Sequence, residues 1–258
     1  MRYGVIADVH GNLHALEAVL AALDRAGVDR IACAGDLVGY GPRPNECVAR
    51  IASLSPAPVV VAGNHDLMAV GRLSASRLGS LPRTTLEWTQ GVLDRDSRAY
   101  LEALPPSAAT EDGVVAAHGS LDDPAEYVFD CGAGMVQLSL LADRHPAARA
   151  LLLGHTHRPL ACAAGGGFLP PWGELELAAG GGGPWLLNAG SVGQSRERLP
   201  LARGLVLDLA GGLASFVAVG YDVRATRREL RAAGLPAHAC HLAPGRAARL
   251  RRRLAARL

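Results

Sequence analysis

Short apolar runs that end in polar residues recur along the chain as far as Leu153. They are Arg2–Ala7, Arg30–Ala34, Pro58–Ala62, Gly113–Ala117 and Ala150–Leu153. A short, wholly apolar run is typical of a buried strand. Between the first three runs, Asn12–Ala26 and Pro44–Leu54 place apolar residues at helical spacing, and Asn12 is suited to cap the first helix. This βαβαβ order predicts a parallel sheet covered by helices.

The second half of the chain has a different pattern, in which short apolar segments are separated by glycines. Further helices are predicted over Thr84–Leu93, Arg95–Leu104 and Gly134–Arg144. Strands of an antiparallel sheet are predicted over Leu175–Leu177, Trp185–Leu187, Gly204–Leu209 and Ala214–Val219, and closing helices over Arg224–Ala233 and Gly245–Leu258. We therefore expect an α/β protein in which the two halves supply two sheets packed face to face, with helices outside. Residues 1–220 would form one domain, and residues 221–258 an arginine-rich helical appendage packed on it.

Composition narrows the class of protein. Hydrophobic residues make up 49% and charged residues 19%, so we expect a sizeable core and no extensive disorder. No apolar run approaches the ~18 residues of a membrane helix, and the run before Asp8 is too short for a signal peptide. We therefore expect a cytoplasmic protein without membrane association. The sequence leaves a homo-oligomer open.

The net charge of +2 conceals an asymmetry. From Arg224 onward the chain has ten arginines and one acidic residue, whereas the part before it is net acidic. Such a tail can bind nucleic acid, or it can be a helix whose arginines face solvent and pair with the acidic body. The acidic body and the 4% aromatic content argue against a nuclease, because stacking platforms for bases would be scarce. We therefore do not expect nucleic acid as the partner.

The five cysteines are Cys33, Cys47, Cys131, Cys162 and Cys240. Their number is odd, they are scattered, and none forms a CxxC pair. We therefore expect buried thiols in a reducing compartment, with neither a disulfide framework nor a cysteine zinc site.

Candidate metal ligands follow the predicted strands. They lie in Asp8-Val9-His10, Gly35-Asp36, Gly63-Asn64-His65-Asp66, His118-Gly119 and Gly154-His155-Thr156-His157. The carboxyl ends of parallel strands meet at one edge of a sheet, so these segments can gather there although they are far apart in the chain. The sequence therefore predicts one site built from five loops.

Two metal ions about 3.5–4 Å apart can clamp the attacking and leaving oxygens of a displacement at phosphorus. A carboxylate is best suited to be shared by both ions, and Asp36 is our candidate. The remaining oxygen and nitrogen ligands would be Asp8, His10, Asn64, His118, His155 and His157. Mixed oxygen and nitrogen ligands without thiolate suit divalent transition metals, manganese first and otherwise iron, cobalt, nickel or zinc.

These residues predict hydrolysis of a phosphate ester by metal-bound hydroxide, since bound ions lower the pKa of water towards ~7. His65 would give the leaving oxygen its proton, and Asp66 would orient and charge His65. Asn12 could face the phosphate from the start of its helix, and Tyr40 and Arg43 could border the pocket. Arg196 and Arg198 could reach the substrate from the loop after Ser191, but for both we expect an exposed loop.

The five blocks, in this order, resemble those of the calcineurin-like metallophosphoesterase superfamily, most closely its small bacterial and archaeal phosphodiesterase branch. The resemblance spans Asp8 to His157, about 60% of the chain. It implies a four-layer α/β/β/α sandwich of two mixed sheets flanked by helices. It also implies one metal on Asp8, His10, Asp36 and His157, a second on Asp36, Asn64, His118 and His155, and His65 as proton donor and phosphate contact.

Two departures refine this resemblance. The arginine after the second block and the glutamate after the Asn-His pair, which are found in the protein Ser/Thr phosphatase branch, have no counterpart here, so a protein phosphatase is not expected. Asn188-Ala189-Gly190-Ser191 resembles an Asn-Pro-Gly-Ser turn of the small branch with Ala189 in place of proline.

A non-catalytic scaffold of the same fold, such as the similar retromer subunit, is the main alternative, although His65 and all seven expected ligands are present.

Overall fold

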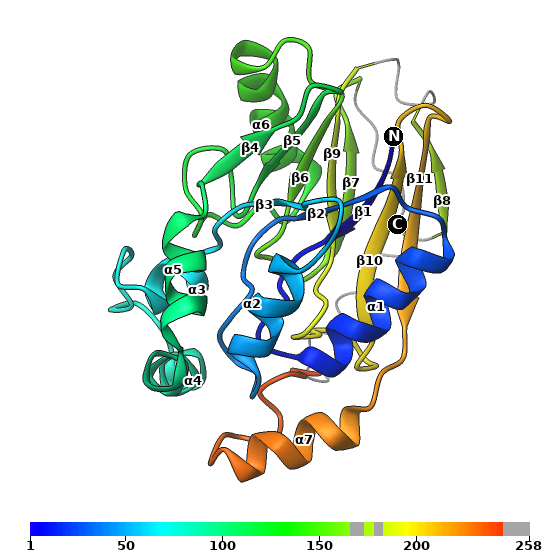
Figure 1. The fold of residues 1–258 in the computed structure, drawn as a ribbon. Helices are drawn as coiled ribbons and strands as arrows, with labels where there is room; N and C mark the ends of the chain where they lie inside the picture. Colours follow the sequence, from blue (N-terminus) through cyan, green and yellow to red (C-terminus); the bar gives the residue numbers. More distant parts are fainter. Residues whose placement is uncertain (166–172, 178–182, 245–258) are drawn as a thin grey trace.

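The computed structural model describes residues 1–165, 173–177 and 183–244. The first of its two sheets has six strands in the order β3-β2-β1-β10-β11-β8. Its parallel strands are β1 (Arg2–Ile6), β2 (Arg30–Cys33) and β3 (Val59–Val60). β10 (Ala202–Asp208) pairs antiparallel with β1, followed by β11 (Leu213–Val219) and β8 (Glu174–Glu176). Chain segments about 200 residues apart therefore form the centre of this sheet (Figure 1).

The second sheet has five strands in the order β4-β5-β6-β9-β7. β5 (Val114–Ala117), β6 (Ala150–Leu153) and β9 (Trp185–Ala189) run parallel to one another. β4 (Ser107–Ala109) and β7 (Pro159–Ala163) pair antiparallel at the two edges. Both sheets are therefore mixed, and both carry parallel strands whose carboxyl ends can meet.

Helices lie outside both sheets (Figure 1). α1 (Leu13–Arg25) and α2 (Pro44–Ala52) lie on the first sheet's side, with α3 (Asn64–Ala69), α4 (Ser80–Val92) and α5 (Arg95–Ala103) beside them. α6 (Cys131–Arg144) packs on the second sheet. α1 forms as expected, because the Asn12 side chain accepts a hydrogen bond from the Ala15 amide and its apolar face is buried.

Three separate layers of buried side chains define the architecture. One lies between α1, α2 and the first sheet and includes Leu16 and Ile51. The second lies between the sheets, where Val5 of β1 and Leu152 of β6 belong to one cluster. The third lies between the second sheet and α6, around Leu138. Three apolar layers separate four layers of secondary structure, which confirms the expected α/β/β/α sandwich.

The expected division of sheets between the two halves of the chain is wrong. We predicted that the strands after Pro159 form one antiparallel sheet, but β8, β10 and β11 join the first sheet whereas β7 and β9 join the second. β9 moreover runs parallel to β6. The short strands β4 and β7 were not predicted.

The expectation of unpaired cysteines is also wrong. Cys131, at the start of α6, forms a disulfide with Cys162 of β7, and their Cα atoms lie 5.5 Å apart. The two residues are 31 positions apart, and only the packing of α6 on the second sheet brings them together. Cys33, Cys47 and Cys240 are free thiols and buried, as expected.

α7 (Val223–Ala232) follows β11 and packs against α1. Its Glu229 accepts hydrogen bonds at 2.8 and 3.0 Å from the Arg43 guanidinium and lies 3.0 Å from the His14 imidazole. Leu230 belongs to a small buried cluster with Leu81 and Trp88 of α4 packed against it. The helix expected over Gly245–Leu258 lies outside the described residues, so the division at residue 220 stays a prediction.

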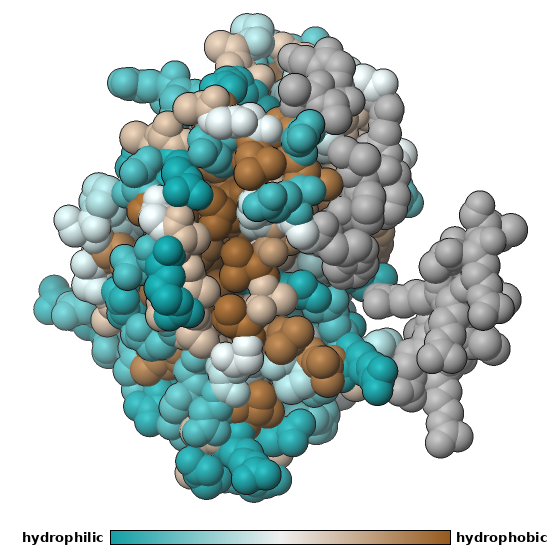
Figure 2. Space-filling view, turned by 90° about the vertical axis from the view of Figure 1, so that its right-hand side faces the viewer, coloured by the Kyte–Doolittle hydropathy of each residue, from teal (hydrophilic) through white to brown (hydrophobic). Residues whose placement is uncertain are grey.

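The face bordered by β11 and β8 carries a band of hydrophobic residues between hydrophilic flanks (Figure 2). Phe216, Val217 and Val219 of β11 are partly buried hydrophobic residues.

Among the described residues, no helix combines the length and the apolar character needed to cross a bilayer.

Candidate metal centre

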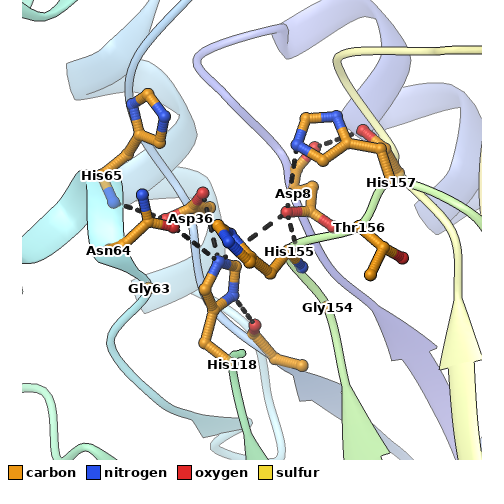
Figure 3. A network of polar contacts seen from close by, with 12 residues as sticks. Asp8, Asp36, Gly63, Asn64, His65, His118, Gly154, His155, Thr156 and His157 are labelled. Carbon is orange, nitrogen blue, oxygen red and sulfur yellow. Dashed lines mark hydrogen bonds and ion pairs between the residues drawn. The ribbon is translucent and has the colours of Figure 1, made fainter. Parts of the chain in front are cut away.

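Residues that follow four different strands converge into two clusters of metal-ligand type. Asp8, His10 and His157 form one cluster, and Asp36, His118 and His155 form the other. Within each cluster the ligand atoms lie within 4.8 Å of one another, and all six residues are buried. Figure 3 shows the side chains of Asp8, Asp36, His118 and His155, which follow β1, β2, β5 and β6, close together and pointing toward one another. The structure therefore brings together six of the seven predicted ligands in two groups of three.

The two clusters are adjacent, and Asp36 reaches both. Its Oδ2 atom lies 3.2 Å from His118 Nε2 and 3.6 Å from His10 Nε2. Asn64, the seventh predicted ligand, places its Oδ1 atom 3.1 Å from His118 Nε2, so it joins the second cluster. A carboxylate between two imidazole clusters is the arrangement that a shared ligand requires.

Backbone carbonyls fix the tautomers of the four histidines. The pairs are His10 Nδ1 with Val38 O at 2.9 Å, His118 Nδ1 with Ala34 O at 2.6 Å, His155 Nε2 with Ala125 O at 3.1 Å, and His157 Nδ1 with Gln194 O at 2.7 Å. A carbonyl can only accept, so each of these nitrogens carries the proton and donates it. The other nitrogen of each neutral ring is left unprotonated and can bind metal, which is how outer partners usually orient metal-binding histidines.

The pKa values of these groups follow from burial and mutual contact. Burial lowers the pKa of His10 to about 3 and that of His155 to about 4, so both rings are neutral at pH 7. Burial also acts to lower the pKa of His118, but Asp36 and Asp8 outweigh it and raise the pKa to about 9. The two carboxylates therefore favour a proton on His118, and a metal ion bound by this ring would compete with that proton.

Two buried polar atoms at the site have no hydrogen-bond partner among the described residues, namely Asp8 Oδ2 and His65 Nδ1. Burial raises the pKa of Asp8 to about 7, while His118 opposes this shift. Buried polar atoms are nearly always satisfied, so an orphaned carboxylate oxygen marks a place where a cation fits. The donor set, the tautomers and this oxygen all fit a pair of divalent metal ions.

The backbone at the site is strained. Six non-glycine residues have positive φ between 48° and 64°, the only ones in the described part of the chain: Asp8, His10, Asp36, Tyr40, His155 and His157. Left-handed conformations cost roughly 1–2 kcal/mol per residue. Bonds between the loops hold them in place, because the His155 amide donates to Asp8 Oδ1 at 3.1 Å and the His65 amide to Asp36 Oδ1 at 2.8 Å. All but Tyr40 are predicted ligands, so the strain is concentrated where the ligands are presented.

Two glycines allow the loops to approach one another. A Cβ atom on Gly63 would overlap the Asp36 carboxylate. A Cβ atom on Gly39, whose φ is 86°, would lie 2.6 Å from His65 Nδ1. The His65 ring therefore occupies space that only glycine leaves free.

The predicted contact between Asp66 and His65 is not formed. Asp66 is fully buried, and its two carboxylate oxygens accept hydrogen bonds from the amides of Val38 at 3.1 Å and Gly63 at 3.0 Å. It therefore ties the Asp36 loop to the start of α3, while His65 Nδ1 has no partner among the described residues. His65 itself lies at the site, with its ring centroid 5.0 Å from that of His10 and 4.9 Å from that of Tyr40.

The three residues predicted to contact the substrate, Tyr40, Asn12 and Arg43, do not lie together at the site. Tyr40 is buried beside His10, with ring centroids 4.7 Å apart. Asn12 is fully buried, and its amide group binds Ala15 and Gly193 of the backbone. The Arg43 guanidinium donates a hydrogen bond to Glu229 of α7. Among these three residues, only Tyr40 lies against the metal-ligand clusters.

Arg196 reaches the site, although we expected an exposed loop. Its Nη2 lies 3.4 Å from His157 Nε2, and its Nε donates to Gln194 Oε1 at 3.1 Å. Burial raises the pKa of Tyr40 to about 12, and Arg196 acts against this shift. Arg198, two positions on, is exposed as expected. The loop is held by Ser191, whose hydroxyl donates to the Asp8 carbonyl at 2.9 Å. In the sequence, the Asn188–Ser191 turn was the signal that pointed to this loop. The contact of Ser191 with Asp8 forms although Ala189 stands in place of proline.

The calcineurin-like phosphoesterase superfamily domain model matches residues 1–211. The chain belongs to this superfamily. An uncharacterized protein of Methanocaldococcus jannaschii is 31% identical over 85% of this chain and 88% of its own length. The crystal structure of a metallophosphoesterase from Sphaerobacter thermophilus aligns with a TM-score of 0.75 and 35% identity over 93% of this chain and 96% of that one. A symmetrical bis(5′-nucleosyl)-tetraphosphatase of Yersinia enterocolitica is 44% identical over a shorter stretch, 24% of this chain and 22% of its own length.

Membership of this superfamily makes the chain a metal-dependent phosphoric ester hydrolase, as the resemblance of its five blocks implied. The family is one of dinuclear metal enzymes, and the two ligand clusters are consistent with it. The relatives are bacterial and archaeal, as expected.

Proposed function

We propose that this protein binds two divalent transition-metal ions and hydrolyses a small phosphate ester, either a diester or a monoester. The observation that carries the proposal is the pair of three-ligand clusters with Asp36 Oδ2 within 3.6 Å of an imidazole nitrogen of each. Manganese is our first expectation, with iron, cobalt, nickel or zinc as alternatives. When bound, such ions polarise the phosphoryl oxygen and lower the pKa of a water ligand.

In this proposal each ligand keeps its expected assignment. Asp8, His10 and His157 would hold one ion, Asn64, His118 and His155 would hold the other, and Asp36 would serve both. The carbonyls of Val38, Ala34, Ala125 and Gln194 hold the protonated nitrogen of each ring, so that the other nitrogen would face the ions.

His65 and Arg196 act on the substrate. His65 is buried beside His10 and is not one of the clustered ligands, so its imidazole is available to give a proton to the leaving oxygen. Arg196 presents a guanidinium beside His157, where it can bind the non-bridging oxygens of a phosphate. Tyr40 packs against the His65 ring and helps to fix its position.

The proposal is tested with purified protein loaded with manganese, cobalt, nickel or zinc, using bis(p-nitrophenyl) phosphate and p-nitrophenyl phosphate. Asp36→Asn should reduce bound metal and abolish turnover, because a shared carboxylate is lost. His65→Gln should keep the metal content and lower kcat by roughly 10²–10⁴-fold. His145→Gln, at the end of α6, is the matched control and should leave both unchanged.

Two results would count against the proposal. Absence of turnover with all four metals would contradict hydrolysis, and bound metal in that preparation would instead support a non-catalytic scaffold. Loss of metal in His65→Gln would show that this residue is a ligand and not a proton donor. A cytoplasmic location stays a prediction that fractionation of the native cells would check.

A further inference from the structure

Two aromatic side chains are exposed beside the metal-ligand clusters. The loop between β5 and α6 presents Tyr127, 46% exposed, and Phe129, 51% exposed, whereas Val128 between them is buried. The chain has only three phenylalanines and five tyrosines. Large exposed apolar groups that gather at one place commonly mark an interaction site.

Tyr127 stacks on His155, a predicted metal ligand. Their ring centroids lie 4.0 Å apart with an interplanar angle of 28°. The ring of Phe129 stacks on that of Tyr127, with centroids 4.9 Å apart and planes within 4° of parallel. Two rings cannot share one face of a third, so Tyr127 lies in the middle and Phe129 forms the outer end. The outer ring centre is thus no more than about 9 Å from the His155 ring.

A cation completes this arrangement. The guanidinium carbon of Arg158 lies 5.6 Å from the centroid of Phe129, over its ring. Arg158 is exposed and directly follows His157 in the chain. An aromatic face beside an arginine attracts planar π systems, and the arginine adds attraction for a nearby phosphate.

The loop that carries the rings is anchored. Ser120 Oγ accepts hydrogen bonds from the amides of Asp122 and Asp123, and the Leu121 amide donates to Gln137 of α6 at 2.9 Å. The carbonyl of Ala125 accepts from His155. The rings are therefore presented in a set position relative to the ligand cluster, and little ordering is needed when a ligand binds.

Support of the His155 imidazole would explain the position of Tyr127 but nothing more. It gives no reason for Phe129, which stacks on the far side of Tyr127 and leaves half of its surface in water. A half-exposed ring at the end of a stack offers apolar area that a planar ligand can cover.

We propose that Phe129, supported by Tyr127 and flanked by Arg158, is a subsite for a planar aromatic group joined to the substrate phosphate, such as a nucleobase or an aryl group. This inference rests on the proposed function, because it places the phosphate at the metal-ligand clusters. The aromatic group packs on the exposed part of the Phe129 ring, next to the Arg158 guanidinium. The subsite therefore selects substrates by what the phosphate carries.

The test measures binding by calorimetry in protein that carries His65→Gln, which should keep the metal and slow hydrolysis of the ligands during the titration. Manganese-loaded protein is titrated with adenosine 5′-monophosphate, phenyl phosphate and ribose 5-phosphate. Phe129→Ala should weaken binding of adenosine monophosphate by about 5- to 100-fold, the range expected for loss of one base–aromatic stack. Binding of ribose 5-phosphate should stay within about twofold. Phe129→Leu, which keeps apolar bulk without a π face, should also weaken binding of adenosine monophosphate.

The controls separate the subsite from general effects. Val136→Ala shortens a side chain that is 59% exposed on α6 and should leave the affinity for all three ligands unchanged. An equal loss for phenyl phosphate in Phe129→Ala would identify a general aryl subsite, and a loss confined to adenosine monophosphate a nucleobase subsite. Equal affinities for adenosine monophosphate and ribose 5-phosphate while Phe129 is intact, or no effect of Phe129→Ala, would overturn the inference. Either result leaves hydrolysis of p-nitrophenyl esters to decide the proposed function separately.

Discussion

Substitution of Gly39 by alanine tests whether the backbone behind His65 sets the position of its ring. Gly39 has a φ of 86°, so any side chain there costs roughly 1–2 kcal/mol in backbone conformation. The added Cβ would also lie 2.6 Å from His65 Nδ1. His65 is 4% exposed and packs between His10 and Tyr40, so it cannot move freely, and overpacking costs roughly 1–3 kcal/mol more. We expect Gly39→Ala to lower the free energy of unfolding by about 2–5 kcal/mol.

The assay is urea unfolding of the metal-free protein in a double-mutant cycle. In the His65→Ala background the clash is absent, so Gly39→Ala should cost only the backbone contribution of about 1–2 kcal/mol. Gly71→Ala is the matched control, because Gly71 has a φ of 78° and nothing within 4 Å of the added Cβ. It should also show the backbone cost alone. Equal losses from Gly39→Ala in both backgrounds would refute the steric argument.

The remaining predictions concern the disulfide, α7 and the bound metals. Reduction of the Cys131–Cys162 bond should lower the free energy of unfolding by about 3–4 kcal/mol, the value expected for a closed loop of 31 residues, and Cys131→Ser should unfold alike with and without reductant. Hydrogen bonds from Arg43 lower the pKa of Glu229, so its contribution to stability is present above about pH 4.5 and is lost as the pH falls through the lowered value. Glu229→Gln should therefore destabilise by up to about 1 kcal/mol at pH 7 and not at pH 2, as followed by thermal unfolding. Chelation should lower the Tm, and added Mn²⁺ should restore about 2.7 kcal/mol at a hundred times its Kd; an unchanged Tm would show that no site had been emptied.

The metal-ligand clusters could be predicted from sequence because their geometry follows from a local rule. Asp8, Asp36, His118 and His155 each follow a short apolar strand, and the carboxyl ends of parallel strands meet at one edge. The position of Asp36 between the two clusters also follows, because a carboxylate is the ligand best suited to be shared, and its Oδ2 atom faces both clusters. Residue type and strand order were sufficient for this part of the structure.

Other features depend on contacts that no local pattern shows. β7 and β4, with sequences Pro-Leu-Ala-Cys-Ala and Ser-Ala-Ala, lack the β-branched residues that signal strands. The pairing of β10 with β1 and the Cys131–Cys162 bond join distant segments, and only the packed structure specifies them. Arg196 follows a turn whose direction is set by Ser191 on the Asp8 carbonyl.

The left-handed residues of the metal centre limit what can replace them. Aspartate, asparagine and histidine enter this region of backbone space more readily than other side chains with a Cβ, and they are also common oxygen and nitrogen donors. At Asp8, His10, Asp36, His155 and His157 the two demands therefore coincide in the same small set of residue types. Substitution by asparagine therefore changes the metal-binding atom and preserves the loop conformation. Alanine or leucine at these positions would remove the ligand atom and also alter the backbone of the turn, so the two effects could not be separated.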